Sequence, residues 1–356
     1  MPTPRLAVAR VIVPSFSRID SESERQQYRR RLFELWGINP SARFPGCNPR
    51  SVSRATLPQL HSEPQLISLK SDGVRYVLLL TLRPGIGGPV ALMIDRAWTM
   101  YEVEVLAPEA YFVEGTVLEG ELVWRQPDDG TLLYLVFDAV ASKGRNLTRE
   151  PFRARLAELR RCTSALEHLQ HLEAHELEQT VLEMDAITVT HYAPRITMRP
   201  KSFVSSVHAT RLWRERGDTD HRVDGIILNG GAAPYRCGTA TAVHKWKPHS
   251  TVDLTLREER LWSSDGPLPE ALHGRTVCVQ ASKLAPAFEG EVMEYLITTT
   301  PTTVLLFPLR KRPDKREANS GRVVLATVSD VLEDVTVEEL SDSSAATTAD
   351  AAEAVE

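Results

Sequence analysis

The stretch "ISLKSDGVRY", residues 67–76, places a lysine at the end of a hydrophobic, strand-like run. The run stops at Lys70, and a small Ser-Asp-Gly turn separates this lysine from Arg75. Burying an ammonium group is costly unless it is paired, so a lysine where a strand enters the core needs an explanation. The pattern Lys-x-Asp-Gly alone is typical of many surface turns, and its meaning depends on the motifs around it.

Short runs of β-branched residues, separated by glycine and proline turns, predict a mostly antiparallel sheet around this stretch. The expected strands cover residues 65–70, 74–82, 90–95, 101–106, 117–124, 132–138, 222–228 and 241–247. A helix is predicted at 21–36, because Ser21-x-x-Glu24 forms a capping box and Gly37 follows the last turn. Leucines at near-helical spacing predict one or two helices in 151–182, and a further helix is expected at 201–215.

The last third of the chain predicts a smaller β domain. Short strands expected at 276–281, 291–299 and 303–309 are typical of a small barrel, and we expect an OB-fold. The fold class is therefore α+β, with an antiparallel-sheet domain followed by a C-terminal OB-fold β-barrel. The expected organisation is a first domain at 1–253 with an N-terminal helical extension at 1–43, a barrel at 254–322, closing helices at 323–340 and an acidic disordered tail at 341–356.

Composition sets limits on the class of protein. The chain has 356 residues, 25% of them charged, and no apolar run approaches the roughly 20 residues that a membrane helix needs. Its four cysteines form no C-x-x-C pair, so we expect neither a zinc site nor a disulfide framework. The net charge of -5 is uneven: nine acidic residues and no lysine or arginine follow Arg322, so a mildly basic body precedes an acidic tail. This pattern agrees with an anionic substrate or with a merely solvated tail.

Charged and aromatic residues recur on the other predicted strands. They are Glu121 in "TVLEGELVW" (116–124), Phe137 in "LYLVFDAV" (133–140), Asp224 in "RVDGIILNG" (222–230), and Lys245 and Lys247 around Trp246. Residues i and i+2 of a strand lie on one face, so the two lysines are expected to point the same way. Each feature alone has an ordinary interpretation, such as a surface carboxylate, a core phenylalanine or a solvated charge. One chemistry accounts for all of them together.

Read in order, these motifs resemble the GTP:RNA guanylyltransferase of mRNA capping enzymes. This family belongs to the covalent nucleotidyltransferase superfamily, in which ATP-dependent DNA and RNA ligases are relatives. The resemblance covers about residues 44–340, and the motifs that carry it are "FPGCNPRSVS" (44–53), "KSDGVRY" (70–76), "MIDR" (93–96), "EGELV" (119–123), "KSF" (201–203), "HKWKPHSTVDL" (244–254) and "RKRPDKREAN" (310–319).

The resemblance implies a nucleotidyltransferase fold and a role for each matched residue. Lys70 is the implied nucleophile that forms a GMP-lysine, and the other implied catalytic residues are Arg75, Glu121, Asp224, Lys245 and Lys247. Glu121 and Asp224 are also the implied ligands of Mg²⁺ or Mn²⁺. The implied GTP-binding residues are Asp72, Gly73, Phe137, Lys201, Phe203, Gly225, Asp253, Arg310, Arg312, Asp314 and Lys315.

A nucleophilic lysine must lose its proton first. A free lysine has a pKa of about 10.4, so only about one molecule in 2,500 is neutral at pH 7. Partial burial and nearby cations both lower the pKa of a lysine, and Lys245 and Lys247 are expected to supply those cations.

The resemblance also implies partners. The GMP acceptor is RNA with a 5′-diphosphate end, and no loop or strand set of a phosphatase is recognised in the chain. We therefore expect a separate RNA triphosphatase and a separate cap methyltransferase, with an RNA polymerase C-terminal domain as a further candidate partner and no membrane. The expected location is the nucleus, or a viral factory or the cytoplasm for a viral protein.

Two other functions stay open. An ATP-dependent polynucleotide ligase shares the superfamily and differs in whether ATP or GTP labels Lys70. A non-catalytic RNA-processing scaffold could keep the fold, although loss of the nucleophile is the usual mark of such a protein, and Lys70 is present.

Overall fold

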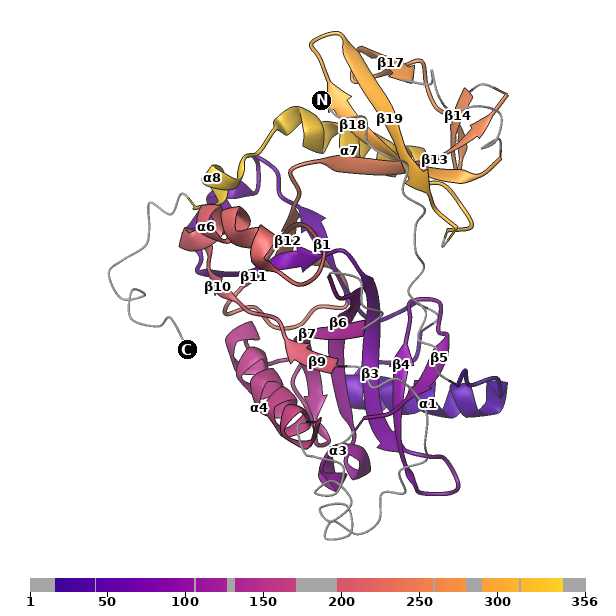
Figure 1. The fold of residues 1–356 in the computed structure, drawn as a ribbon, viewed down its shortest axis with the longest axis vertical. Coiled ribbons are helices and arrows are strands. Elements are labelled where there is room, and N and C mark those ends of the chain that lie inside the picture. Colours follow the sequence, from indigo (N-terminus) through magenta and orange to yellow (C-terminus); the bar gives the residue numbers. More distant parts are fainter. Residues whose placement is uncertain are drawn as a thin grey trace. The chain divides into compact units, whose positions relative to one another are not determined.

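A computed structural model describes residues 17–41, 43–105, 107–126, 132–170, 197–258, 260–279, 290–313 and 315–341. The chain divides into two compact units, which are described separately. The larger unit contains Ile12–Arg50, Gln59–Lys245 and Leu340–Glu356, and the smaller unit contains Met1–Val11, Ser51–Pro58 and Trp246–Glu339. Figure 1 shows the elements with their labels. Within the described ranges, no helix is both long and apolar enough to cross a membrane.

The larger unit is built on two sheets. The seven-stranded sheet has the order β5 (Met100–Val103), β4 (Pro89–Ile94), β3 (Val74–Leu82), β6 (Thr116–Trp124), β7 (Leu132–Ser142) and β8 (Arg145–Asn146), with β9 (Thr197–Pro200) paired in parallel with β7. The five-stranded sheet has the order β1 (Cys47–Ser51), β12 (Gly238–Trp246), β11 (Val223–Gly230), β2 (Gln65–Ser71) and β10 (Val204–Ser205). The expected α+β class with mainly antiparallel pairing is confirmed.

Strand β3 lies at the centre of the core and is buried on both faces. Val77 and Leu79 belong to the apolar cluster that contains Leu32 and Trp36 of helix α1 (Glu22–Trp36). The alternate residues of β3 belong to a second cluster with α4 (Phe152–Gln170) and α3 (Glu109–Val113). Helices thus cover both faces of this sheet (Figure 1), which explains its near-continuous hydrophobic strands.

Helix α1 begins and ends where its caps predict. The Ser21 hydroxyl accepts the backbone N–H of Glu24 at 3.3 Å, and Gly37 ends the helix at a φ of 68°. Further short helices among the described residues are α2 (Leu57–Ser62), η1 (Ser206–His208), α6 (Ala209–Arg214) and η2 (Glu215–Asp218).

The expected continuous helix at 201–215 is wrong. Val204 and Ser205 pair with Ile67 and Leu66 of β2, so their backbone groups are used by the sheet. Helical structure starts only after this pairing, and α6 itself is a single short helix. In the region expected to be helical at 151–182, α4 is confirmed, and 171–182 lies outside the described residues.

The described residues of the smaller unit form a second seven-stranded sheet and the helices that follow it. Its sheet order is β15 (Gly266–Pro267), β14 (Arg260–Ser263), β13 (Ser250–Arg257), β18 (Val292–Thr299), β19 (Thr303–Lys311), β17 (Arg275–Val279) and β16 (Ala271–Leu272). Val324 and Val328 of α7 (Gly321–Glu333) join its core, and α8 (Val337–Ser341) follows. Strands β14, β15 and β16 were not predicted, because they have only four, two and two residues.

Candidate active site

Lys70 lies where the chain leaves one sheet and enters the other. It is the penultimate residue of β2 in the five-stranded sheet, and β3 of the seven-stranded sheet begins at Val74. The turn between them passes against β6, because a Cβ atom on Gly73 would lie 2.4 Å from the Leu122 carbonyl oxygen. Only glycine fits this close approach, which explains the Lys-x-Asp-Gly pattern.

Asp224 is the direct partner of Lys70. The Lys70 Nζ atom donates to Asp224 Oδ1 at 2.8 Å, and their side chains are 22% and 28% exposed, so both remain accessible to a ligand. Ser71 pairs with Val223 and Lys70 with Gly225, so Asp224 is the extra residue of a β-bulge. Such bulges redirect side chains, and this one directs a carboxylate to the lysine of the neighbouring strand.

The charges around Lys70 differ from the expectation. Burial alone lowers the pKa of Lys70, but the Asp224, Glu121 and Asp72 carboxylates outweigh burial and raise it above its usual value. The predicted lowering of the Lys70 pKa is therefore wrong for the protein's own groups. The site stabilises the charged ammonium, and a reaction at this nitrogen needs a further change that removes its proton.

Lys201 lies beside this pair and is almost fully buried. Its Nζ atom donates to Glu121 Oε2 and to the Leu69 carbonyl, both at 3.3 Å. Burial lowers the pKa of Lys201, and the charge of Lys70 lowers it further, while Glu121 acts in the opposite direction. Of the two lysines, Lys201 is thus the one whose surroundings disfavour the proton.

The half-buried ring of Phe137 has two cations against it. The guanidinium carbon of Arg75 lies 5.4 Å from the ring centroid, and Lys201 Nζ lies 5.8 Å from it. The structure thus brings Lys70, Arg75, Glu121, Phe137, Lys201 and Asp224 together from strands of both sheets.

Arg75 is held by residues that the sequence did not single out. Its guanidinium donates to the fully buried Glu119 and to the Cys47 carbonyl, and the Tyr235 hydroxyl donates to Glu119 Oε2 at 2.7 Å. A Cβ atom on Gly46 would lie 2.7 Å from Arg75 Nη2, which explains the glycine of the Phe-Pro-Gly segment. Glu119 could have been found, since it lies two residues before Glu121 on the same strand face. Tyr235 carries no such local signal.

Four further predicted residues of the larger unit are Asp72, Phe203, Gly225 and Lys245. The Asp72 N–H donates to the Arg222 carbonyl at 2.8 Å, and Gly225 is the strand partner of Lys70. Phe203 packs edge-on against Phe152, with centroids 5.2 Å apart, and so also serves the core. Lys245 lies on β12.

The remaining predicted residues form a separate group in the smaller unit. Asp253 of β13 is almost fully buried and pairs with Arg312 at 2.9 Å and with Lys315. Arg310 pairs with Glu294 of β18. Asp253 therefore holds two of the cations predicted to bind phosphates. Lys247 also belongs to this unit, and Asp314 lies outside the described residues.

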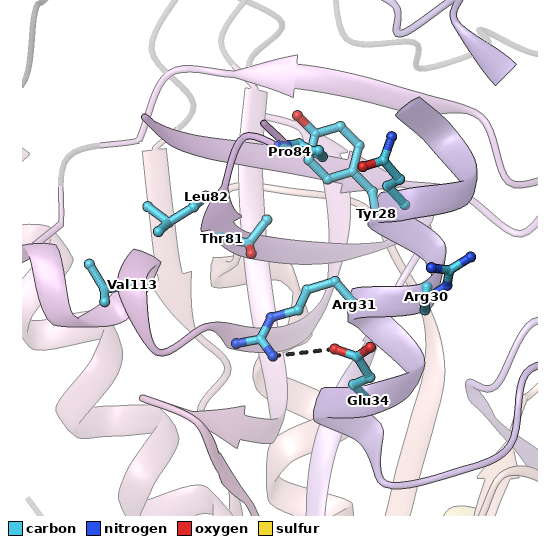
Figure 2. A pocket seen from close by; sticks show the side chains of 9 residues that line it. Tyr28, Arg30, Arg31, Glu34, Thr81, Leu82, Pro84 and Val113 are labelled. Atoms are coloured by element: carbon cyan, nitrogen blue, oxygen red, sulfur yellow. Dashed lines mark hydrogen bonds and ion pairs between the residues drawn. The ribbon is translucent and has the colours of Figure 1, made fainter. Parts of the chain in front are cut away.

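A pocket of the larger unit lies at the opposite end of β3 from Arg75. Thr81 and Leu82 line it together with Tyr28 and Arg31 of α1, and Figure 2 shows the ion pair between Arg31 and Glu34 at its edge. It contains none of the predicted site residues, so this hollow is not the candidate active site.

The amino-acid sequence is similar to the sequences of known proteins. Residues 11–249 match the family model described as mRNA capping enzyme, catalytic domain. The mRNA-capping enzyme subunit alpha of Schizosaccharomyces pombe is 30% identical over 66% of this chain and 58% of its own length. The protein of the same name from Saccharomyces cerevisiae is 28% identical over 65% of this chain and 51% of its own length.

Among solved structures, mycobacterial DNA ligase D complexed with ATP and MES aligns at 13% identity with a TM-score of 0.43, covering 76% of this chain and 95% of that one. The chain spans about half the length of the curated relatives it matches. Since the family model matches well over half of its residues, the chain belongs to the family of mRNA capping enzyme catalytic domains.

Proposed function

We propose that the chain is a guanylyltransferase that transfers GMP from GTP to the 5′-diphosphate end of RNA through Lys70. The observation that carries the proposal is the Lys70–Asp224 pair, exposed to a ligand beside Phe137 and Lys201. In the first step Lys70 Nζ attacks the α-phosphorus of GTP. A P–N bond forms, the bond between the α-phosphorus and its bridging oxygen breaks, and pyrophosphate leaves.

In the second step a terminal phosphate oxygen of the RNA attacks the same phosphorus. The P–N bond breaks, the nitrogen takes back a proton, and the cap GpppN forms. Splitting one difficult transfer into two steps is the general advantage of covalent catalysis.

Lys70 must lose a proton before the first step, and its surroundings define how. Because Asp224 raises the pKa of Lys70, weakening this contact makes the amine a better nucleophile. Mg²⁺ or Mn²⁺ fits here, since Mg²⁺ is commonly held by one or two carboxylates together with phosphates, and Glu121 and Asp224 are two accessible carboxylates. Glu121 and Asp224 would hold such an ion, which would supply neutralisation of the phosphate charge.

Lys201 and Phe137 support guanine as the base. An ammonium has three N–H donors, and Lys201 uses two of them on Glu121 and the Leu69 carbonyl. The third suits the O6 acceptor of guanine and opposes the amino group that adenine presents there. The Phe137 ring offers a surface for stacking, with Arg75 next to it for the ribose.

The smaller unit is proposed to be an OB-fold that supplies phosphate contacts. Arg310, Arg312 and Lys315, together with Lys245 and Lys247, would bind the β- and γ-phosphates, and Asp314 is a further residue of the proposed GTP site. The proposed organisation is a nucleotidyltransferase domain at 1–253 with a helical extension at 1–43, the OB-fold at 254–322, closing helices at 323–340 and an acidic tail at 341–356. Asp72, Gly73, Phe203, Gly225 and Asp253 complete the proposed GTP site.

The proposed partners follow from the chemistry. The yeast relatives are named alpha subunits of capping enzymes, which supports work beside other proteins. We propose a separate RNA triphosphatase, a separate cap methyltransferase and an RNA polymerase C-terminal domain, with the nucleus as the location for a cellular protein and a viral factory or the cytoplasm for a viral one.

Incubation with α-labelled GTP or α-labelled ATP and Mg²⁺, followed by a denaturing gel, tests the proposal. GTP should label the wild-type chain, and diphosphate-ended RNA should then remove the label. Labelling by ATP instead would assign the chain to the ligases, and labelling by neither would contradict a covalent enzyme.

A further inference from the structure

A hydrogen-bonded chain of side chains lies directly behind Lys70. The Ser71 hydroxyl is 3.1 Å from His221 Nε2, and His221 Nδ1 is 3.2 Å from Asp220 Oδ1. Asp220 in turn accepts two bonds from Arg199, at 2.7 and 3.0 Å. Because side chains alternate along a strand, Ser71 points to the face of β2 opposite Lys70. The chain of contacts therefore supports the strand without blocking the lysine.

These contacts connect the two sheets that share the candidate site. Ser71 belongs to β2 of the five-stranded sheet, and Arg199 belongs to β9 of the seven-stranded sheet. A further antiparallel bridge joins Arg125, at the end of β6, to His221. His221 is thus the point at which segments of both sheets meet, and it precedes β11 by two residues.

Each of these segments also carries a site residue. Ser71 follows Lys70, Arg199 lies two residues before Lys201, and His221 lies three residues before Asp224. A displacement of His221 would therefore change the positions of three charged groups relative to one another. A misplacement of about 1 Å can reduce a reaction rate about a hundredfold.

The groups that form these hydrogen bonds decide which atom donates and which accepts. Asp220 only accepts, so Nδ1 of His221 carries the proton and donates to it, and Nε2 accepts from the Ser71 hydroxyl. Burial lowers the pKa of His221, and the charges of Lys201 and Arg199 lower it further against the pull of Asp220. Arg125 also faces this carboxylate at 3.6 Å. At neutral pH His221 is uncharged and fits this pattern.

We propose that His221 is a positioning residue that fixes Lys70 and Asp224 of one sheet against Lys201 and Phe137 of the other through its bonds to Ser71 and Asp220. This inference rests on the proposed guanylyl transfer. It adds a residue that touches neither substrate nor metal and that acts through the placement of the groups that do.

The test compares His221→Ala and His221→Gln with wild type, and uses His208→Ala as a matched control because His208 is exposed on η1. The rate of labelling by α-labelled GTP is measured over a range of GTP concentrations, with thermal unfolding of each variant. His221→Ala should lower the maximal rate about tenfold to a hundredfold with little change in half-saturating GTP. His221→Gln, whose amide can also donate and accept, should restore most of the rate, and His208→Ala should match wild type.

A wild-type rate in His221→Ala would overturn the role of His221 while leaving the proposed function intact. A rate loss that follows thermal destabilisation equally in His221→Ala and His221→Gln would overturn it as well. Absence of label on the wild-type chain would contradict the proposed function instead. Independently of activity, nitrogen NMR of the wild type should show the neutral Nδ1-protonated tautomer of His221 at pH 7, and the Nε2-protonated form would contradict the inferred bonds.

Discussion

Replacing Asp224 by asparagine should make Lys70 easier to deprotonate and yet make the enzyme slower. The carboxylate lies 2.8 Å from the ammonium, and both side chains are largely buried. Two unit charges about 4 Å apart are worth about 1 kcal/mol in water and about 4 kcal/mol near a protein surface. Taking about 2 kcal/mol as the net loss, the pKa of Lys70 should fall by about 1.5 units in Asp224→Asn.

The assay is the rate of GMP attachment in a single turnover, measured from pH 6 to pH 10 for wild type and variant. Because neutral Lys70 is the reactive form and its pKa lies above the usual value, the wild-type rate should rise with pH across this whole range. In Asp224→Asn the same rise should be displaced by about 1.5 pH units towards lower pH, while the rate at the highest pH falls because a carboxylate for the metal is lost. Asp20→Asn is the control, since Asp20 is exposed. A rise at the same pH values in Asp224→Asn as in wild type, with activity still measurable, would refute the electrostatic account of Lys70.

Three further changes probe other parts of the structure. Tyr235→Phe removes a donor to the buried carboxylate of Glu119 and should lower the free energy of unfolding by about 1–3 kcal/mol, measured by urea denaturation; no change would mean that water replaces the hydroxyl. Lys201→Ala should reduce labelling by GTP and narrow the gap to ATP in a competition assay, and an unchanged preference would contradict the base contact. Burial lowers the pKa of His244, so as the pH falls below about 6.5 the unfolded protein takes up a proton on this histidine before the folded protein does. The free energy of unfolding should therefore decrease between pH 7.5 and pH 5.5 in wild type and decrease less in His244→Leu. Equal decreases in the two proteins would contradict this assignment.

Capping and turn residues in the sequence predicted the ends of some helices and strands correctly. Ser21 and Gly37 predicted α1 to within one residue, and turn residues predicted both ends of β3. The signals failed where tertiary pairing decides: 201–215 has helical composition, but its first part is used to extend the sheet beside β2. The short strands β14, β15 and β16 owe their extended form to pairing with β13, β14 and β17, which no local pattern reveals.

The sequence predicted which residues belong to the candidate site, but it did not predict which of their side chains contact one another. Lys70 and Asp224 are 154 positions apart, and only the bulge in β11 explains why their side chains meet. Glu119 holds Arg75 and could have been found from its position on β6, whereas Tyr235, which donates to Glu119, carries no signal in the sequence around it. The direction of the Lys70 pKa shift also depended on which charges the fold brings nearest, and these are carboxylates.

The central claim is that Lys70 itself carries the GMP. Wild type and Lys70→Arg are incubated with GTP and Mg²⁺, digested under conditions that keep the P–N bond, and the peptides are analysed by mass spectrometry. The account predicts one GMP on Lys70 of the wild type and none anywhere in Lys70→Arg, because a guanidinium stays protonated. GMP on a different residue of the wild type, or full-strength GMP attachment in Lys70→Arg, would contradict it.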